Sequence, residues 1–219
     1  MIKSIILLSG GLDSLVSLGL KKEELNIDLA LTFDYGQISA QKEIEASEKI
    51  CKYYNIKHQI IKLDFLREIT QSSLVNEQIS IPDTNSEQNV KSLWVPNRNG
   101  LFLNIAASYA DSYRYDYIII GANKQEAKFF PDNSAEFIDA INKEFEYSTM
   151  NKTKAVAPLL NYDKNDIVML ALKNNLPLEL TMSCYQGKNK NCGMCTSCKN
   201  LKNALLANND SKYIKILFD

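Results

Sequence analysis

Short runs of consecutive apolar residues alternate along the chain with longer segments in which apolar residues recur every three or four positions. The first run, residues 5–8, predicts a buried strand, and helical spacing begins after it at residues 15–20. The same alternation continues as a strand at 28–33, a helix at 39–54 and a strand at 57–63. This β-α-β-α-β order predicts a parallel sheet with helices on both of its faces.

The rest of the chain extends the pattern. Two further strands are predicted at 117–120 and 155–159, which makes the predicted sheet five-stranded. Further helices are predicted at 66–72, at 97–113 with Asn97 as its cap, at 135–145 with Ser134 as its cap, at 164–174 with Asp163 as its cap, and at 201–206. We therefore expect an α/β fold with a doubly wound, parallel five-stranded sheet.

One long segment, residues 73–93, interrupts this pattern because it is polar and shows no clear periodicity. Long loops inside compact domains are usually functional or mobile. We interpret this one as a lid or an oligomer-contact loop, and a plain surface connector is the alternative.

Composition limits the classes of function. The chain has 219 residues, of which 45% are hydrophobic, and a formal net charge of −1. This length suits one α/β domain, predicted at residues 1–180, with a smaller C-terminal module at 181–219. The near-zero net charge gives no general indication of nucleic-acid binding, and no segment is long and apolar enough to cross a bilayer. Because no signal peptide is visible, we expect a cytoplasmic protein.

A glycine pair stands between the first predicted strand and helix, in the run Ser9-Gly10-Gly11-Leu12-Asp13-Ser14. Glycines let the backbone turn sharply and approach a ligand, and the following helix start offers unpaired N–H groups to a phosphate. The two serines add hydroxyl donors, and Asp13 is suited to hold a magnesium ion between phosphates. The run lacks the lysine of the Walker loop and the third glycine of the dinucleotide fingerprint. An ordinary tight βα turn is the alternative.

Four cysteines crowd the C-terminal end at Cys184, Cys192, Cys195 and Cys198, with gaps of seven, two and two residues. Two-residue gaps let thiolates converge on one ion, and four thiolates close a tetrahedral site, which favours structural zinc. An iron–sulfur cluster is the alternative, since it uses similar spacings. The fifth, Cys51, is interpreted as a core residue.

Polar groups follow the predicted strands where parallel strands usually bind ligands. The turn 34–37 and the loop 121–134 both lie at such strand ends. Arg98 stands near a helix start, where the helix dipole disfavours a cation, so we expect an anion beside it. A solvated arginine is the alternative. His58, the only histidine, is assigned no functional role.

The Ser-Gly-Gly-x-Asp-Ser run resembles the PP-loop of enzymes that use ATP to adenylate a substrate. Together with the block Val95-Pro96-Asn97-Arg98-Asn99, the pair Pro131-Asp132 and the four-cysteine ending, it resembles the 7-cyano-7-deazaguanine synthase family over nearly the whole chain. That family belongs to queuosine precursor synthesis.

The resemblance implies a fold of the adenine nucleotide alpha hydrolase type, one zinc ion per chain, Mg-ATP as co-substrate and a homodimer. It implies a ligase that converts 7-carboxy-7-deazaguanine and ammonia to the 7-nitrile. The expected ATP contacts are Leu8, Ser9, Gly10, Gly11, Leu12, Asp13, Ser14, Leu15 and Phe33. The expected catalytic residues are Asp13, Ser14, Arg98 and Lys164, and the expected substrate contacts are Arg98, Asn123 and Asp132. A tRNA-thiolating PP-loop enzyme and a nucleotide-binding sensor without turnover remain as alternatives.

Overall fold

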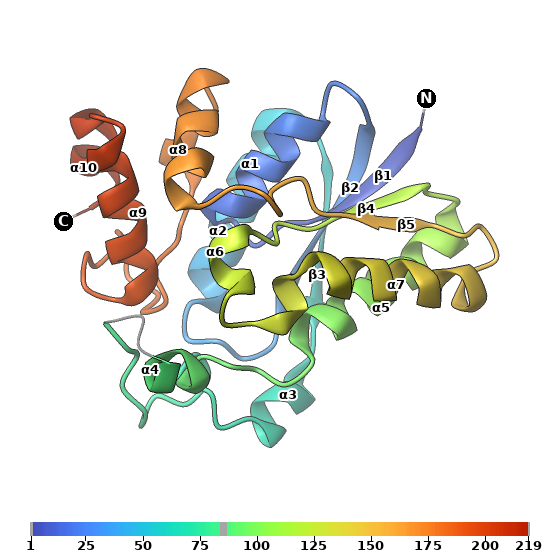
Figure 1. Cartoon of the computed structure of the whole chain (residues 1–219), viewed down its shortest axis with the longest axis horizontal. Coiled ribbons are helices and arrows are strands. Elements are labelled where there is room, and N and C mark those ends of the chain that lie inside the picture. The colour runs from blue at the N-terminus through green and yellow to red at the C-terminus, as the bar shows by residue number, and fades with distance from the viewer. Residues whose placement is uncertain (1, 84–86, 219) are drawn as a thin grey trace.

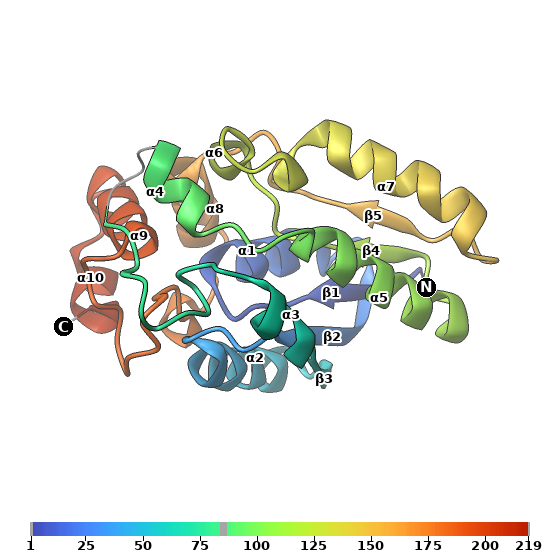
Figure 2. The same cartoon turned by 90° about the horizontal axis from the view of Figure 1, so that it is seen from below.

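A five-stranded parallel sheet forms the centre of the protein, as a computed structural model that describes residues 2–83 and 87–218 shows. The strands lie in the order β3-β2-β1-β4-β5, which can be followed across Figure 2. Their bounds are β1 Lys3–Leu7, β2 Asn26–Asp34, β3 Lys57–Lys62, β4 Tyr117–Ile119 and β5 Lys154–Val156. The predicted α/β fold with five parallel strands is therefore confirmed.

Alternate residues of the central strand enter two different cores. Ile6 packs in one buried cluster, whereas its neighbours Ile5 and Leu7 pack in the other. Because side chains of a strand point alternately to opposite faces, the continuous apolar run of β1 marks a strand that is covered on both sides. The sheet is doubly wound.

Helices cover both faces of this sheet (Figure 1). The first face carries α1 (Leu12–Lys21), α2 (Ala40–Tyr54) and α8 (Lys164–Lys173). The second face carries α3 (Asp64–Ile69), α5 (Arg98–Tyr113) and α7 (Ala135–Ser148). Among the described residues, no helix is long and apolar enough to span a membrane.

Two of the three predicted helix caps are confirmed. The Ser134 side chain accepts the Phe137 N–H at 3.1 Å, and Asp163 forms a reciprocal capping box with Asp166 at the start of α8. The Asn97 prediction is wrong in part, because Asn97 occupies the cap position but its side chain makes no capping hydrogen bond. Its backbone is left-handed, with a φ of 53°.

Several boundaries differ from the predictions. The helix expected at 66–72 is α3, which begins two residues earlier and ends at Ile69. The fifth strand ends at Val156, since Pro158 has no N–H to continue the ladder. The expected loop 73–93 contains the short helix α4 (Glu87–Ser92), and residues 84–86 lie outside the described residues. Short helical turns also form at α6 (Lys124–Ala127), Pro131–Asn133 and Leu178–Leu180.

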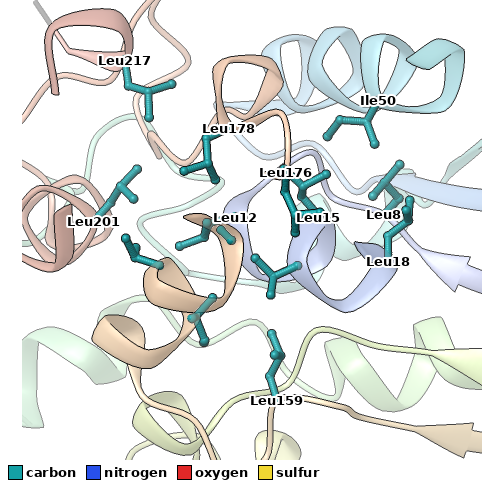
Figure 3. Close-up of a cluster of buried hydrophobic side chains, with 14 of the residues drawn as sticks. Leu8, Leu12, Leu15, Leu18, Ile50, Leu159, Leu176, Leu178, Leu201 and Leu217 are labelled. Atoms are coloured by element: carbon teal, nitrogen blue, oxygen red, sulfur yellow. The ribbon is translucent and has the colours of Figure 1, made fainter. Parts of the chain in front are cut away.

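The C-terminal segment packs into the first core. The helix expected at 201–206 is part of α9 (Thr196–Ala207), and a further helix, α10 (Ser211–Leu217), was not predicted. Leu201 and Leu217 share one buried cluster with Leu12 and Leu15 of α1 (Figure 3). This shared core holds the cysteine segment against the carboxyl edge of the sheet.

Candidate functional site

The glycine pair forms a sharp turn that delivers the chain from β1 into α1. Gly10 has a φ of +75°, and a Cβ there would lie 2.6 Å from the Glu43 carbonyl oxygen and 2.8 Å from Ala46 Cβ. Only glycine fits this position without strain. Gly11 then occupies the cap position of α1 with an ordinary extended backbone. The first N–H groups of α1 are thereby presented at the edge of the sheet.

Two hydroxyls flank this turn. The Ser9 and Ser14 Oγ atoms lie 3.3 Å apart, and the Ser14 hydroxyl donates to the Gly11 carbonyl oxygen at 3.0 Å. Ser9 is exposed, whereas Ser14 is buried. The arrangement has the features of a phosphate site, with hydroxyls and helix N–H groups facing the same space.

A cavity opens at this turn. It lies where β1 is flanked by β2 on one side and β4 on the other, which is the switch point of a doubly wound sheet. The expected site residues on its wall are Leu8, Ser9, Gly11, Leu12, Asp13, Ser14, Phe33, Arg98 and Lys164. Gly10, Leu15, Asn123 and Asp132 are not on the wall.

Asp13 and Lys164 form a close ion pair at the mouth of the turn. The Lys164 Nζ lies 2.8 Å and 2.7 Å from the two carboxylate oxygens of Asp13, and 3.8 Å from the Glu126 carboxylate. The Asn123 amide also donates to Asp13 at 3.3 Å from behind the wall. Burial opposes the charge of Lys164, but the two carboxylates outweigh it, so the pKa of Lys164 is raised.

Arg98 lies at the first position of α5 with its guanidinium in the cavity wall. It donates to the Tyr35 hydroxyl at 3.1 Å, and its Cζ lies 5.7 Å from the Tyr35 ring centre. Among the side chains of residues 2–83 and 89–218, no carboxylate oxygen lies within 4 Å of this guanidinium. Burial disfavours its charge, but Tyr35 and the more distant Asp132 carboxylate raise the pKa of Arg98 above its ordinary value. A cation in this state is suited to bind an anionic ligand.

Sequence reasoning missed two carboxylates on the cavity wall, Glu43 and Glu126. Burial raises the pKa of both. Glu43 lies in the predicted helix 39–54 and Glu126 in the polar loop 121–134, and neither pattern marks a site residue. The one available signal was position, since Glu43 lies in the first turn of the helix that follows the strand-end turn at Gln37.

The four C-terminal cysteines converge, as their spacing predicts. Their Sγ atoms all lie within 4.8 Å of one another, and those of Cys192 and Cys198 are 3.8 Å apart. The backbone N–H groups of Met194 and Cys195 both point at the Cys192 Sγ, at 3.4 Å each. Such N–H groups stabilise a thiolate, so this cluster is a candidate metal centre.

Comparison with known proteins identifies the family. The family model described as "Queuosine biosynthesis protein QueC" matches residues 3–209. The chain belongs to the QueC family.

Three curated relatives of this QueC chain carry the same name. A protein of Carboxydothermus hydrogenoformans named 7-cyano-7-deazaguanine synthase is 49% identical over 92% of this chain and 97% of its own length. Proteins of the same name from Methanosarcina mazei and Methanosarcina barkeri are 49% and 45% identical, each over 90% of both chains.

Solved structures similar to this QueC chain share its fold. A U34-tRNA thiolase from Methanococcus maripaludis with a [4Fe-4S] cluster matches with a TM-score of 0.52 and 18% identity, covering 99% of this chain and 70% of that one. A 4-thiouridine synthetase in complex with RNA and ATP matches with a TM-score of 0.56 and 22% identity, covering 93% of this chain and 50% of that one. At these identities the likeness concerns the fold alone.

Proposed function

We propose that the protein is an ATP-dependent ligase that converts 7-carboxy-7-deazaguanine and ammonia to 7-cyano-7-deazaguanine, as the names of its QueC relatives suggest. The observation that carries the proposal is that the glycine turn, the Asp13–Lys164 pair and the Arg98 cation border the same cavity. These are the groups that a carboxylate and a triphosphate need in order to react side by side.

The first half of the reaction activates a poor electrophile. A carboxylate oxygen attacks the α-phosphorus of ATP, pyrophosphate leaves, and a mixed anhydride with AMP forms. Ammonia then adds to the carboxyl carbon, AMP leaves, and loss of a proton gives the amide. The amide oxygen then attacks the α-phosphorus of a second ATP and a second pyrophosphate leaves. Loss of AMP and two protons gives the nitrile.

The glycine turn binds the phosphates in this proposal. Ser9, Gly11 and Ser14 hold the β- and γ-phosphates through N–H groups and hydroxyls, and Gly10, behind the wall, shapes the turn that presents them. Asp13 would hold a magnesium ion at this turn, and that ion would offset part of the negative charge of the phosphates. The end of β2 at Phe33 borders the adenosine, and Leu8, Leu12 and Leu15 support the turn.

Two cations have different roles. The pairing with Asp13 places Lys164 beside the glycine turn. We therefore assign Lys164 to the phosphates around the reacting phosphorus. Arg98 has no close carboxylate among the described residues, so we assign it to the substrate carboxylate, which its planar guanidinium matches in shape.

Substrate contact by Asn123 and Asp132 stays a prediction. Asn123 is fully buried and holds Asp13, which suits a positioning role. The Asp132 carboxylate accepts from the Asn133 amide at 3.0 Å, and Asn133 itself is on the cavity wall. Asp132 could therefore contact the substrate ring only if its side chain moved toward the cavity.

We propose that the cysteine cluster holds structural zinc. With zinc–sulfur bonds of about 2.3 Å, the sulfurs of a tetrahedral site stand about 3.8 Å apart. The Cys192–Cys198 separation of 3.8 Å fits one ion. A four-iron cluster places irons and sulfides between its thiolates and needs wider spacing. The cytoplasmic location and the homodimer stay predictions.

Mass spectrometry of the products tests the proposed reaction. Incubation with ATP, magnesium, ammonium and 7-carboxy-7-deazaguanine should give the nitrile together with AMP and pyrophosphate, and Asp13→Asn or Ser14→Ala should abolish most of this turnover in a folded protein. Near-normal turnover in both variants would remove the glycine turn from the mechanism. Binding of ATP without AMP release would instead favour a sensor, and salt-sensitive RNA binding would favour a tRNA-modifying enzyme.

A further inference from the structure

The Glu43 carboxylate on the cavity wall has no role in the reaction as derived so far. Glu43 extends from the first turn of α2 beside the glycine turn, and its side chain faces the cavity. Among the described residues, no lysine or arginine nitrogen lies within 4 Å of it. A half-buried carboxylate without a cation is costly, so its presence calls for a ligand or a structural reason.

The Glu43 carboxylate is held in a fixed direction. Its Oε1 accepts the Ser39 hydroxyl at 2.6 Å, and its Oε2 accepts the Gln37 amide at 2.9 Å. Gln37 is locked in turn, because its amide also donates to the Phe33 carbonyl oxygen and its oxygen accepts the Tyr35 N–H. Each Glu43 oxygen keeps a free lone pair, since a carboxylate oxygen accepts two hydrogen bonds.

The neighbouring wall is aromatic. Tyr35 is buried, and Phe102 lies against it with ring centres 5.8 Å apart. Phe102 also stacks on Phe33 at 4.0 Å with nearly parallel planes. Tyr35 is in contact with the Arg98 guanidinium, so an acceptor (Glu43), an aromatic surface and a cation (Arg98) border the same cavity.

We propose that Glu43 is a specificity-determining residue that reads the guanine-type edge of the substrate ring, accepting hydrogen bonds from its ring N–H and its exocyclic amino group. This inference rests on the proposed function. The substrate is a flat ring with two adjacent donors on one side and a carboxylate on the other. Glu43 and Arg98 supply the complementary charges on one aromatic wall.

The alternative ring in this cavity is the adenine of ATP. Adenine pairs one donor, its amino group, with an acceptor nitrogen at the adjacent position, so an ionised carboxylate matches only half of that edge. The guanine edge offers two donors side by side and satisfies both oxygens of Glu43. Burial raises the pKa of Glu43, and two ring donors would restore part of the solvation that burial removes.

Calorimetric binding of the ring without ATP tests this inference independently of turnover. The probes are 7-carboxy-7-deazaguanine and its analogue without the 2-amino group. We expect the unaltered protein to bind the analogue about 10- to 100-fold more weakly, which is the effect of losing a hydrogen bond to a charged group. Glu43→Gln should lose most of this discrimination, because its amide NH₂ meets a ring donor.

Glu45→Gln is the matched control. Glu45 lies on the same helix, is more exposed, and pairs with Lys42 at 2.8 Å, so this variant should keep the full discrimination. Glu43→Asp keeps the negative charge, but its side chain is shorter by one methylene group. It should give intermediate discrimination, and it serves as the second variant if Glu43→Gln unfolds.

Three results would overturn the assignment. The first is full discrimination between the two ring ligands in both Glu43 variants. The second is loss of this discrimination in Asp132→Asn while Glu43→Gln keeps it, and the third is a Glu43→Gln variant in which only the KM for ATP rises. Absence of nitrile formation by the unaltered protein would overturn the proposed reaction instead, and the ring-binding comparison would still decide the role of Glu43.

Discussion

Lys164 Nζ contacts both carboxylate oxygens of Asp13, at 2.8 Å and 2.7 Å, although the two residues are 151 positions apart in the chain. Asp13 lies in the first turn of α1 after the first strand, and Lys164 begins α8 after the fifth. The capping box of Asp163 fixes the start of α8, and with it the position from which Lys164 reaches the glycine turn. The pair therefore joins two helix starts across the carboxyl edge of the sheet.

This pair should act as one unit in catalysis. We expect Lys164→Ala and Asp13→Asn each to lower kcat/KM for ATP roughly 100-fold, because each removes charge from the site of phosphoryl chemistry. The double variant should be little worse than either single variant, since each change disables the same unit. Steady-state assays of AMP release measure this. Lys173→Ala, at the exposed end of α8, is the control, and additive losses in the double variant would contradict the coupling.

The two glycines of the turn should respond differently to alanine. At Gly10 a Cβ would meet the backbone of α2 at 2.6 Å in a left-handed conformation, so Gly10→Ala should lower the free energy of unfolding by about 1–3 kcal/mol. At Gly11 the nearest atom would be 3.4 Å away and the backbone is ordinary, so Gly11→Ala should fold normally.

The second variant isolates the ligand contact. Gly11 is on the cavity wall, and a methyl group there would stand between the first turn of α1 and a phosphate. Gly11→Ala should therefore raise the KM for ATP while its urea midpoint stays close to that of the unaltered protein. Equal stability losses in the two variants would show that the turn does not distinguish these positions in the way described.

The sheet could be predicted from sequence because its signals are local. The β1 strand is an apolar run buried on both faces, and the caps Ser134 and Asp163 bond only to residues two or three positions away. Helices α4 and α10 were missed because helices of six or seven residues depend on tertiary packing more than on their own propensity.

The candidate site was predictable only where one segment carries it. The glycine turn and the cysteines are contiguous patterns, so their residues could be named from spacing. Glu43 reaches the cavity only because Gln37 and Ser39 orient it, and its helix otherwise has the charge pattern of a solvated surface. Such a role depends on the fold of the turn, which the sequence pattern does not specify.

The cysteine cluster should bind one zinc ion per chain and anchor the C-terminal segment. The Asn191 side chain donates to the Leu217 carbonyl oxygen at 3.1 Å and accepts the Ser183 N–H at 3.1 Å, so the cluster is tied to the end of α10. Chelation should therefore increase hydrogen exchange first beyond about Thr181, before the sheet is affected.

Two cysteine variants separate metal binding from packing. Cys195→Ser should lose zinc by elemental analysis, whereas Cys51→Ala should keep it, because Cys51 is buried on α2 and is not one of the clustered thiols. Simultaneous loss of protection in β1 and α9 on chelation would contradict a local anchoring role. Iron with acid-labile sulfide in place of zinc would contradict the metal assignment.

His58 should make stability depend on pH in the neutral range. Its Nε2 lies 2.8 Å from the Thr32 hydroxyl, which itself donates to the Leu8 carbonyl oxygen, so the neutral ring donates from Nε2. Burial lowers the pKa of His58 below its ordinary value of 6.5, and Glu48 offsets this only in part.

The sign follows from proton binding. The pKa of His58 is lower in the folded protein than in the unfolded chain, so at acidic pH the unfolded chain binds more protons. The contribution of His58 to the free energy of unfolding is therefore complete above about pH 6.5 and is lost as the pH falls. His58→Gln keeps a donor for Thr32 but does not titrate. The urea midpoint of the unaltered protein should therefore decrease more than that of His58→Gln between about pH 7.5 and 5.5. Parallel decreases in the two proteins would show that His58 titrates alike in the folded and unfolded states.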